Sequence, residues 1–233
     1  MRKILTLMLT LTLFTLTSSA QPKFLSKAKK SVLAINTYDS QGNLLRKGSA
    51  LLIGADGEAI GDYKTFRDAY KAVATDYSGK QWPVSLILGA DDTYSVVRFK
   101  VDTKSTPAAS IATQPTALHA QTYLLKMDSE KAVVSEGASI ADTSSLNGKY
   151  MYYGLSKKVS DEYLGSPVYD ASGTLIGVVH STLGEKSYVL DIRFAKDLKI
   201  EAITSSSSSL ALKNIHIAKA LPDNQEEALV YLY

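Results

Sequence analysis

Residues 164–180 read LGSPVYDASGTLIGVVH, and this stretch carries the strongest structural signal of the chain. The runs Pro167–Tyr169 and Leu175–His180 are rich in apolar and β-branched residues, as strands are. Between them, the sequence 170–173 (Asp-Ala-Ser-Gly) has the composition of a tight turn. The stretch therefore predicts a β-hairpin that begins directly after a Gly-Ser-Pro sequence.

Strand signals continue in both directions from this hairpin. Residues 31–38 and 44–53 form a second hairpin pattern around a turn at 39–42. Residues 102–121 are polar, rich in Thr, Pro and Ala, and weakly periodic, so they read as a connection between two halves. A series of about a dozen short strands with turns every ~8–12 residues predicts two small antiparallel barrels or one large sandwich, and periodicity alone does not separate these.

The composition excludes several classes of function. The 233 residues are 45% hydrophobic and 21% charged, and the net charge of +3 is too small to indicate a nucleic-acid partner. The chain has no cysteine, which excludes disulfides and thiolate chemistry. The three histidines, His119, His180 and His216, lack the HExxH spacing of a zinc site. We therefore expect no metal and no cofactor.

The first 20 residues have the pattern of a secretory signal peptide. Arg2 and Lys3 precede an apolar run at 4–16, and small residues lead up to Ala20. We expect cleavage near Ala20 and export to the periplasm or the cell exterior. The apolar run is too short for a membrane span, so the mature chain is expected to have none.

Three segments, taken in order, resemble the trypsin-like serine peptidases, most closely the bacterial Deg (HtrA-like) branch. Residues 48–57 are similar to the Gly-Ser-Gly-Phe-x-Ile…Gly entry of the first barrel, and 88–101 to the Asp-Leu-Ala-Val-Leu-Lys-Val strand. Residues 164–179 resemble the nucleophile loop and the hairpin after it. The resemblance implies an all-β double barrel over 21–204. It places two six-stranded antiparallel barrels at about 31–102 and 121–199.

The same resemblance implies that the catalytic triad is lost. The family's histidine, aspartate and serine positions are occupied here by Lys64, Ser95 and Leu164. A leucine offers no nucleophilic atom, so no base could activate it. The oxyanion loop reads Glu162-Tyr163-Leu164, and Glu162 replaces a glycine whose backbone freedom aims an N–H group inward. The chain is therefore expected to bind a protein or peptide rather than to cut it.

The candidate binding residues are Tyr163, Gly165, Ser166 and His180. The resemblance places them in or beside the position of the family's substrate-binding cleft. A Ser166–Lys64 dyad would be a relocated catalytic pair. The alternative interpretation of Ser166 is packing, and that of His180 is a half-buried strand histidine.

The C-terminal part, 205–233, begins with a serine run that reads as a flexible linker and continues to a helix signal at Pro222. Three hypotheses follow: an exported inactive trypsin-like binding module, a divergent endopeptidase with a relocated nucleophile, and a cell-envelope assembly factor that acts through this tail.

Overall fold

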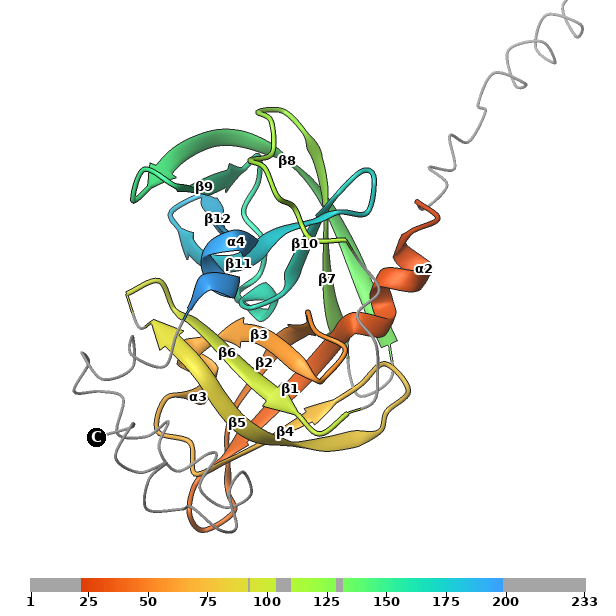
Figure 1. Cartoon of the computed structure of the whole chain (residues 1–233), viewed down its shortest axis with the longest axis vertical. Helices are drawn as coiled ribbons and strands as arrows, with labels where there is room; N and C mark the ends of the chain where they lie inside the picture. The colour runs from red at the N-terminus through yellow and green to blue at the C-terminus, as the bar shows by residue number, and fades with distance from the viewer. Residues whose placement is uncertain (1–21, 92, 104–109, 129–131, 199–233) are drawn as a thin grey trace, which may run out of the picture.

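The computed structural model describes residues 22–91, 93–103, 110–128 and 132–198 (Figure 1). The expected leader at 1–20, the serine run at 205–209 and the expected helix after Pro222 lie outside these residues. None of the helices in the described part is long and apolar enough to cross a membrane.

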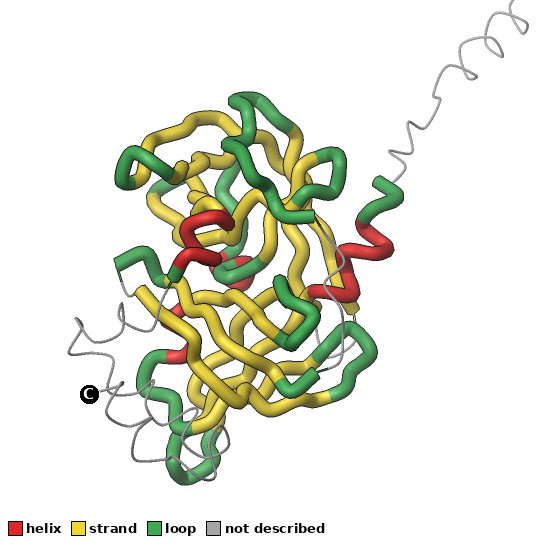
Figure 2. Tube along the Cα trace, in the orientation of Figure 1, coloured by secondary structure: helices red, strands yellow, loops and turns green. Residues whose placement is uncertain are grey.

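The described chain forms two β-barrels stacked one above the other, with short helices beside and between them (Figures 1 and 2). The first barrel consists of β1 (Val32–Tyr38), β2 (Leu44–Leu52), β3 (Glu58–Asp62), β4 (Lys71–Thr75), β5 (Gln81–Asp91) and β6 (Val96–Val101). The second consists of β7 (Gln121–Asp128), β8 (Ala132–Leu146), β9 (Tyr150–Leu155), β10 (Pro167–Asp170), β11 (Leu175–Leu183) and β12 (Lys186–Asp191). The helices are α2 (Leu25–Ala28), η2 (Lys29–Ser31), α3 (Tyr63–Phe66), η3 (Asp161–Tyr163) and α4 (Ile192–Asp197).

Both barrels are closed and antiparallel, which confirms the predicted fold class. The strand order is β1-β2-β3-β6-β5-β4 in the first and β10-β11-β12-β9-β8-β7 in the second. The hairpin predicted at 164–180 is the β10–β11 pair, in which Pro167 lies opposite Val178. Closure gives each strand two neighbours over part of its length, so unpaired edges remain only where a strand extends beyond one of its neighbours.

Apolar side chains fill three regions. Each barrel has its own core, and a third cluster lies between the barrels. Strand alternation explains how one strand serves two of these regions. Leu52 of β2 points into the first barrel, whereas its neighbour Leu51 packs in the cluster between the barrels. The two barrels therefore bury a shared face, and loops from both meet beside it.

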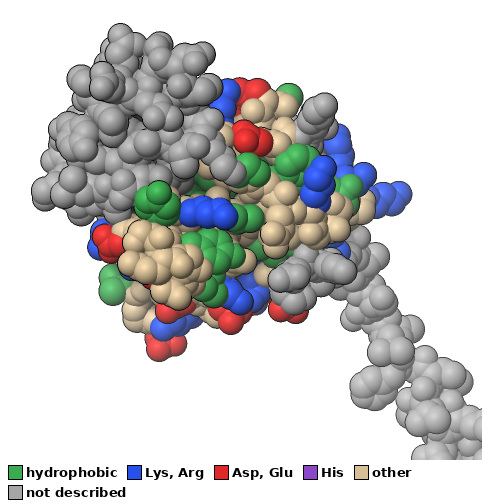
Figure 3. All heavy atoms as spheres, turned by 90° about the horizontal axis from the view of Figure 1, so that it is seen from below, with side chains coloured by type: hydrophobic (Ala, Val, Ile, Leu, Met, Phe, Trp, Pro, Cys, Tyr) green, Lys and Arg blue, Asp and Glu red, His purple; other side chains and the backbone are tan. Residues whose placement is uncertain are grey.

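The end of the first barrel is exposed and chemically mixed. Viewed from below, hydrophobic side chains gather beside Lys and Arg side chains on this face (Figure 3). Exposed large hydrophobic residues of the first barrel include Leu44, Leu45 and Tyr70.

Candidate functional site

The site begins at the end of β3, where Asp62 caps the short helix α3. One Asp62 carboxylate oxygen, Oδ2, accepts hydrogen bonds from the backbone N–H of Thr65 at 3.1 Å and from its hydroxyl at 3.4 Å. A carboxylate is a favoured N-cap because it satisfies N–H groups that have no partner within the helix. The cap fixes the first turn of α3 and leaves Lys64 exposed on the helix.

Ser95 completes the environment of the Asp62 carboxylate. Its hydroxyl donates to Oδ1 of Asp62 at 2.7 Å, and both residues are only 4% exposed. Burial raises the pKa of Asp62, and the hydrogen bonds from Ser95 and Thr65 together with the positive charge of Lys64 oppose that rise only in part. The position where the family resemblance places a carboxylate thus holds a hydroxyl, and that hydroxyl serves a different, buried carboxylate.

In the loop around Leu164, two backbone N–H groups donate hydrogen bonds to other atoms of the same loop. In η3 and the residue after it, the N–H of Leu164 donates to the carbonyl of Asp161 at 3.0 Å. The N–H of Glu162 points to the hydroxyl of Ser160 at 3.3 Å. An oxyanion hole requires such N–H groups to be free and aimed at the substrate oxygen. Here both groups are engaged within the loop.

Gly165 joins this loop of the second barrel to the first barrel. Its φ of +78° is a conformation that glycine adopts without strain. A Cβ atom added there would lie 2.4 Å from the carbonyl oxygen of Ser49 and 2.7 Å from the N–H nitrogen of Asp62. The absence of a side chain at Gly165 therefore allows the Leu164 loop to lie directly on β2 and the end of β3.

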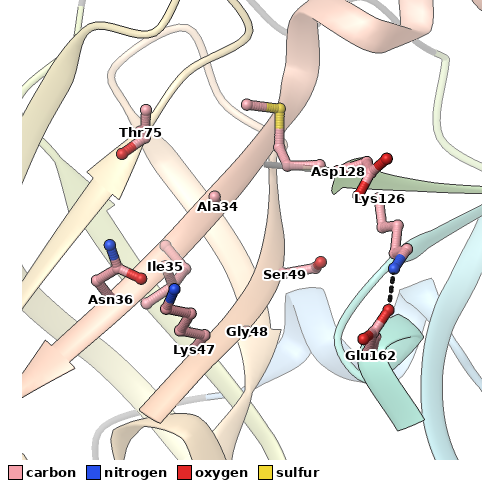
Figure 4. A pocket seen from close by; sticks show the side chains of 11 residues that line it. Ala34, Ile35, Asn36, Lys47, Gly48, Ser49, Thr75, Lys126, Asp128 and Glu162 are labelled. Atoms are coloured by element: carbon pink, nitrogen blue, oxygen red, sulfur yellow. Dashed lines mark hydrogen bonds and ion pairs between the residues drawn. The ribbon is translucent and has the colours of Figure 1, made fainter. Parts of the chain in front are cut away.

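These contacts bring Lys64, Asp62 and Leu164 to the wall of one open cavity of about 360 Å³. Ser95 is hydrogen-bonded to Asp62, so Lys64, Ser95 and Leu164, which the sequence resemblance equates with the triad positions, lie in one region. A second cavity of about 270 Å³ adjoins the first, and Figure 4 shows the side chains that line it. Sequence reasoning missed Asp62, although its position before a helix-forming stretch matches the N-cap pattern.

The other predicted site residues are packed rather than open. Ser166 is 0% exposed, and its hydroxyl has no hydrogen-bond partner among the described residues. It does not line the cavity beside Lys64. Tyr163 is buried, which raises its pKa to about 12, and the ammonium of Lys126 lies 5.2 Å from its ring centroid.

His180 lies on β11, and its ring meets the ring of Tyr152 edge-on with centroids 5.3 Å apart. Its Nδ1 is buried without a hydrogen-bond partner in the described part of the chain. Burial lowers the pKa of His180, and Lys64 lowers it further, while the Tyr94 backbone and Asp91 act in the opposite direction. Lys64 is thus close enough to His180 to disfavour its protonated form.

We also searched the described residues for side chains that could bind a metal ion. Within them, no group of three or more His, Cys, Asp or Glu side chains is arranged to hold an ion.

Two strand edges border the site. Among the described residues, the part of β11 beyond Val178 pairs with β12 alone, from Val179 to Leu183. The backbone of Val179 also bonds to Gly165 and Ser166. In the first barrel, β2 pairs with β3 only from Ala50 onward.

The double-barrel fold matches that of solved serine proteases. The active form of the Rv3671c protease from M. tuberculosis superposes with a TM-score of 0.65 at 17% sequence identity, covering 75% of this chain and 82% of that one. Its inactive form gives a TM-score of 0.62 at 16% identity, covering 75% and 90%. The fold is that of the trypsin-like serine proteases.

A serine endoprotease from Yersinia pestis has the same fold, with a TM-score of 0.64 at 14% identity, covering 74% of this chain and 62% of that one. No family model matches the sequence, and no curated protein matches it either. At these identities the likeness establishes the fold, and the chemistry has to be argued from the residues of this trypsin-like chain.

Proposed function

We propose that this chain is an exported, catalytically inactive trypsin-like protein that holds an extended segment of a protein partner in the cleft between its barrels. The observation that carries the proposal is at Leu164. The residue at the nucleophile position has an aliphatic side chain, and the N–H groups of Leu164 and Glu162 are already bonded within their own loop. Nucleophile and oxyanion stabilisation are therefore both missing, and these supply most of the acceleration in such enzymes.

Peptide binding is supported by the strand edges. An extended peptide can add to a sheet where a strand lacks a neighbour, and backbone hydrogen bonds then supply affinity without any chemistry. The segment Ser181–Leu183 pairs with β12 on one side and has no second neighbouring strand among the described residues. The three ordered sequence segments at 48–57, 88–101 and 164–179 support placement near the Deg branch, and the leader pattern at 1–20 supports export.

The test combines turnover with covalent labelling. The mature protein is incubated with casein and, separately, with a fluorophosphonate probe, and an active trypsin-like protease serves as the positive control. We expect no casein cleavage and no labelling. Cleavage that disappears in Ser166→Ala would overturn the proposal and favour a divergent endopeptidase with Ser166 as nucleophile. Export is tested by fractionation of cells that express the full chain, in which retention of the uncleaved protein in the cytoplasm would contradict it.

Binding is tested separately, by isothermal titration with a library of extended peptides. Loss of affinity on Thr182→Pro, which removes a backbone N–H group from the β11 edge, would support edge pairing, and Thr182→Ala is the matched control. A different result would favour the assembly-factor hypothesis over binding in the cleft. In that result no peptide binds, and a protein partner co-purifies with the full chain but not with a chain that lacks residues 205–233.

A further inference from the structure

The connection between β8 and β9 contains the only Asn-Gly sequence of the chain. Asn147 and Gly148 follow Leu146, the last residue of β8. Their φ angles are +53° and +68°, a conformation that asparagine and glycine adopt more readily than other residues. Asn-Gly is therefore a favoured sequence for the tip of a hairpin. Asparagine is also one of the thermally labile residues, so the same two residues are a candidate site of covalent change.

Deamidation at such a sequence needs only the next backbone nitrogen and water. The nitrogen of Gly148 bonds to Cγ of Asn147, the C–N bond of the side-chain amide breaks, and ammonia leaves with the proton of the Gly148 N–H group. Water then opens the imide ring. If the new C–N bond breaks, position 147 becomes aspartate. If the old peptide bond breaks, it becomes isoaspartate, in which the chain continues through the side-chain carbon atoms. Because Gly148 has no side chain, its nitrogen is open to this attack.

The structure leaves both reacting groups accessible. Asn147 and Gly148 are exposed, and a Cβ atom added at Gly148 would meet no atom within 4 Å. Among the described residues, the Asn147 amide and the Gly148 N–H group take part in no hydrogen bond. The turn is closed by the bond from the Lys149 N–H to the Leu146 carbonyl, and at 3.3 Å this bond is longer than the usual value of about 2.9–3.0 Å. The backbone of Asn147 can therefore rotate toward ring closure at the cost of one weak bond.

The other two asparagines of the described chain lack this combination of features. Asn36 is half-buried within β1, and the next residue, Thr37, belongs to the same paired strand. The side-chain amide of Asn43 donates to Asp39 at 2.9 Å, and Leu44 follows it. The side chain of the following residue shields the attacking nitrogen in both cases. The structure therefore distinguishes one asparagine from the other two.

We propose that Asn147 is a site of spontaneous deamidation, at which the turn between β8 and β9 gains a carboxylate and, in part of the molecules, an additional backbone carbon atom. Water is the only co-reactant. The site lies in the second barrel and involves none of the residues that line the cavities between the barrels. The change is therefore independent of binding in the cleft.

The residues that follow this turn attach β9 to α4. The ammonium of Lys149 and the hydroxyl of Tyr150 both donate to Asp197, at 2.8 and 2.6 Å. An aspartate at position 147 would offer that ammonium a second acceptor at an exposed site, where ion pairs contribute little to stability. Isoaspartate would instead lengthen the backbone inside the turn. We therefore expect isoaspartate to disturb the turn bond at Leu146 and the attachment to α4, and aspartate to leave both in place.

The test is tryptic peptide mapping of the full mature chain after storage in mildly alkaline buffer, with an unstored sample as the baseline. Cleavage after lysine and arginine gives a peptide 132–149, in which Asn147 is the only asparagine, and a peptide 31–46, which contains Asn36 and Asn43. We expect the stored sample to lose the original 132–149 peptide and to gain its aspartate and isoaspartate forms. The 31–46 peptide should stay unchanged. Asn147→Gln should abolish the new products, and the matched variant Asn43→Gln should leave them as in the wild type.

The effect on the fold is measured on the reacted fraction, which ion exchange separates from the unreacted protein by its additional negative charge. This fraction should unfold at a lower urea concentration than Asn147→Asp, which carries the charge without the additional backbone carbon. Equal midpoints would contradict the presence of isoaspartate in the turn. Survival of the original 132–149 peptide, or equal conversion of both peptides, would overturn the proposal. So would conversion that occurs only in urea, because the folded turn would then protect Asn147.

Discussion

Replacing Ser95 by aspartate should destabilise the fold strongly at pH 7 and weakly at pH 4. The hydroxyl of Ser95 lies 2.7 Å from the carboxylate of Asp62, and both residues are buried. The new carboxylate would meet Asp62 at nearly the same separation. Two unit charges about 3 Å apart repel by about 5–6 kcal/mol at an effective dielectric constant of about 20.

Protonation limits the size of this effect. Keeping one carboxyl group with an ordinary pKa of 3.8 protonated at pH 7 costs about 4.4 kcal/mol, at about 1.4 kcal/mol per pH unit. Because this is less than the repulsion, the two facing carboxyl groups of the folded variant should share one proton, and the variant should lose about 4 kcal/mol. The folded form then binds more protons than the unfolded form between pH 4 and 7. Its stability therefore falls as pH rises through this range.

The assay is urea unfolding of the wild type, S95D and S95N at pH 7 and pH 4. Asparagine matches aspartate in size, carries no charge, and can donate to Asp62. We expect S95D to be about 4 kcal/mol less stable than S95N at pH 7 and within about 1 kcal/mol of it at pH 4. Equal stability of S95D and S95N at pH 7 would refute the reasoning. If the expected difference is found, restoring an aspartate to the family's position also requires removal of Asp62.

Three further predictions test the site. Leu164→Ser alone should give no measurable hydrolysis of an activated ester, because the N–H groups of its loop stay engaged; saturable turnover would contradict this. Burial lowers the pKa of His180 in the folded chain, so the unfolded chain binds the proton first and the folded state loses stability as the pH falls below 6.5. His180→Gln removes this group, so the stability of the variant should depend less on pH in that range. Urea midpoints from pH 8 to 5 measure this, and parallel profiles for both proteins would count against it. Gly165→Ala should destabilise the fold more than Gly42→Ala. Both glycines have a positive φ, and this strain alone predicts a loss of about 1–2 kcal/mol for Gly42→Ala. Only at Gly165 does backbone lie within 3 Å of the new Cβ atom. Equal losses in urea unfolding would disprove the packing argument.

The fold could be predicted from the sequence because its signals are local. Turn residues and β-branched runs mark most strands, and the hairpin at 164–180 is found where the pattern places it. Local signals were less accurate at α3. The local pattern of residues 65–71 predicts a short helix, but α3 is Tyr63–Phe66, and Lys71 already begins β4. The helix starts earlier because Asp62 caps it. Soon after its end, Asp68 has a φ of 62°, a conformation that is not helical.

The site could be predicted only where residue identity decides the chemistry. Leucine at position 164 lacks a nucleophilic atom in any conformation. The bond between Ser95 and Asp62 joins residues 33 positions apart, and it depends on the register of β3 and β6, which the local pattern does not specify. The engaged N–H groups of the Leu164 loop depend on backbone conformation, which a glutamate at position 162 favours without fixing it.

The backbone conformation at Glu162 supports two interactions at once. In η3 the N–H of Glu162 donates to the hydroxyl of Ser160, and the Glu162 side chain forms an ion pair with Lys126, which lines the cavity beside β2. Turning that N–H toward a substrate oxygen would require a different backbone conformation at Glu162. An oxyanion hole at this position would therefore have to form at the expense of the hydrogen bond to Ser160, and the Glu162 side chain would have to keep its contact with Lys126 from a changed backbone.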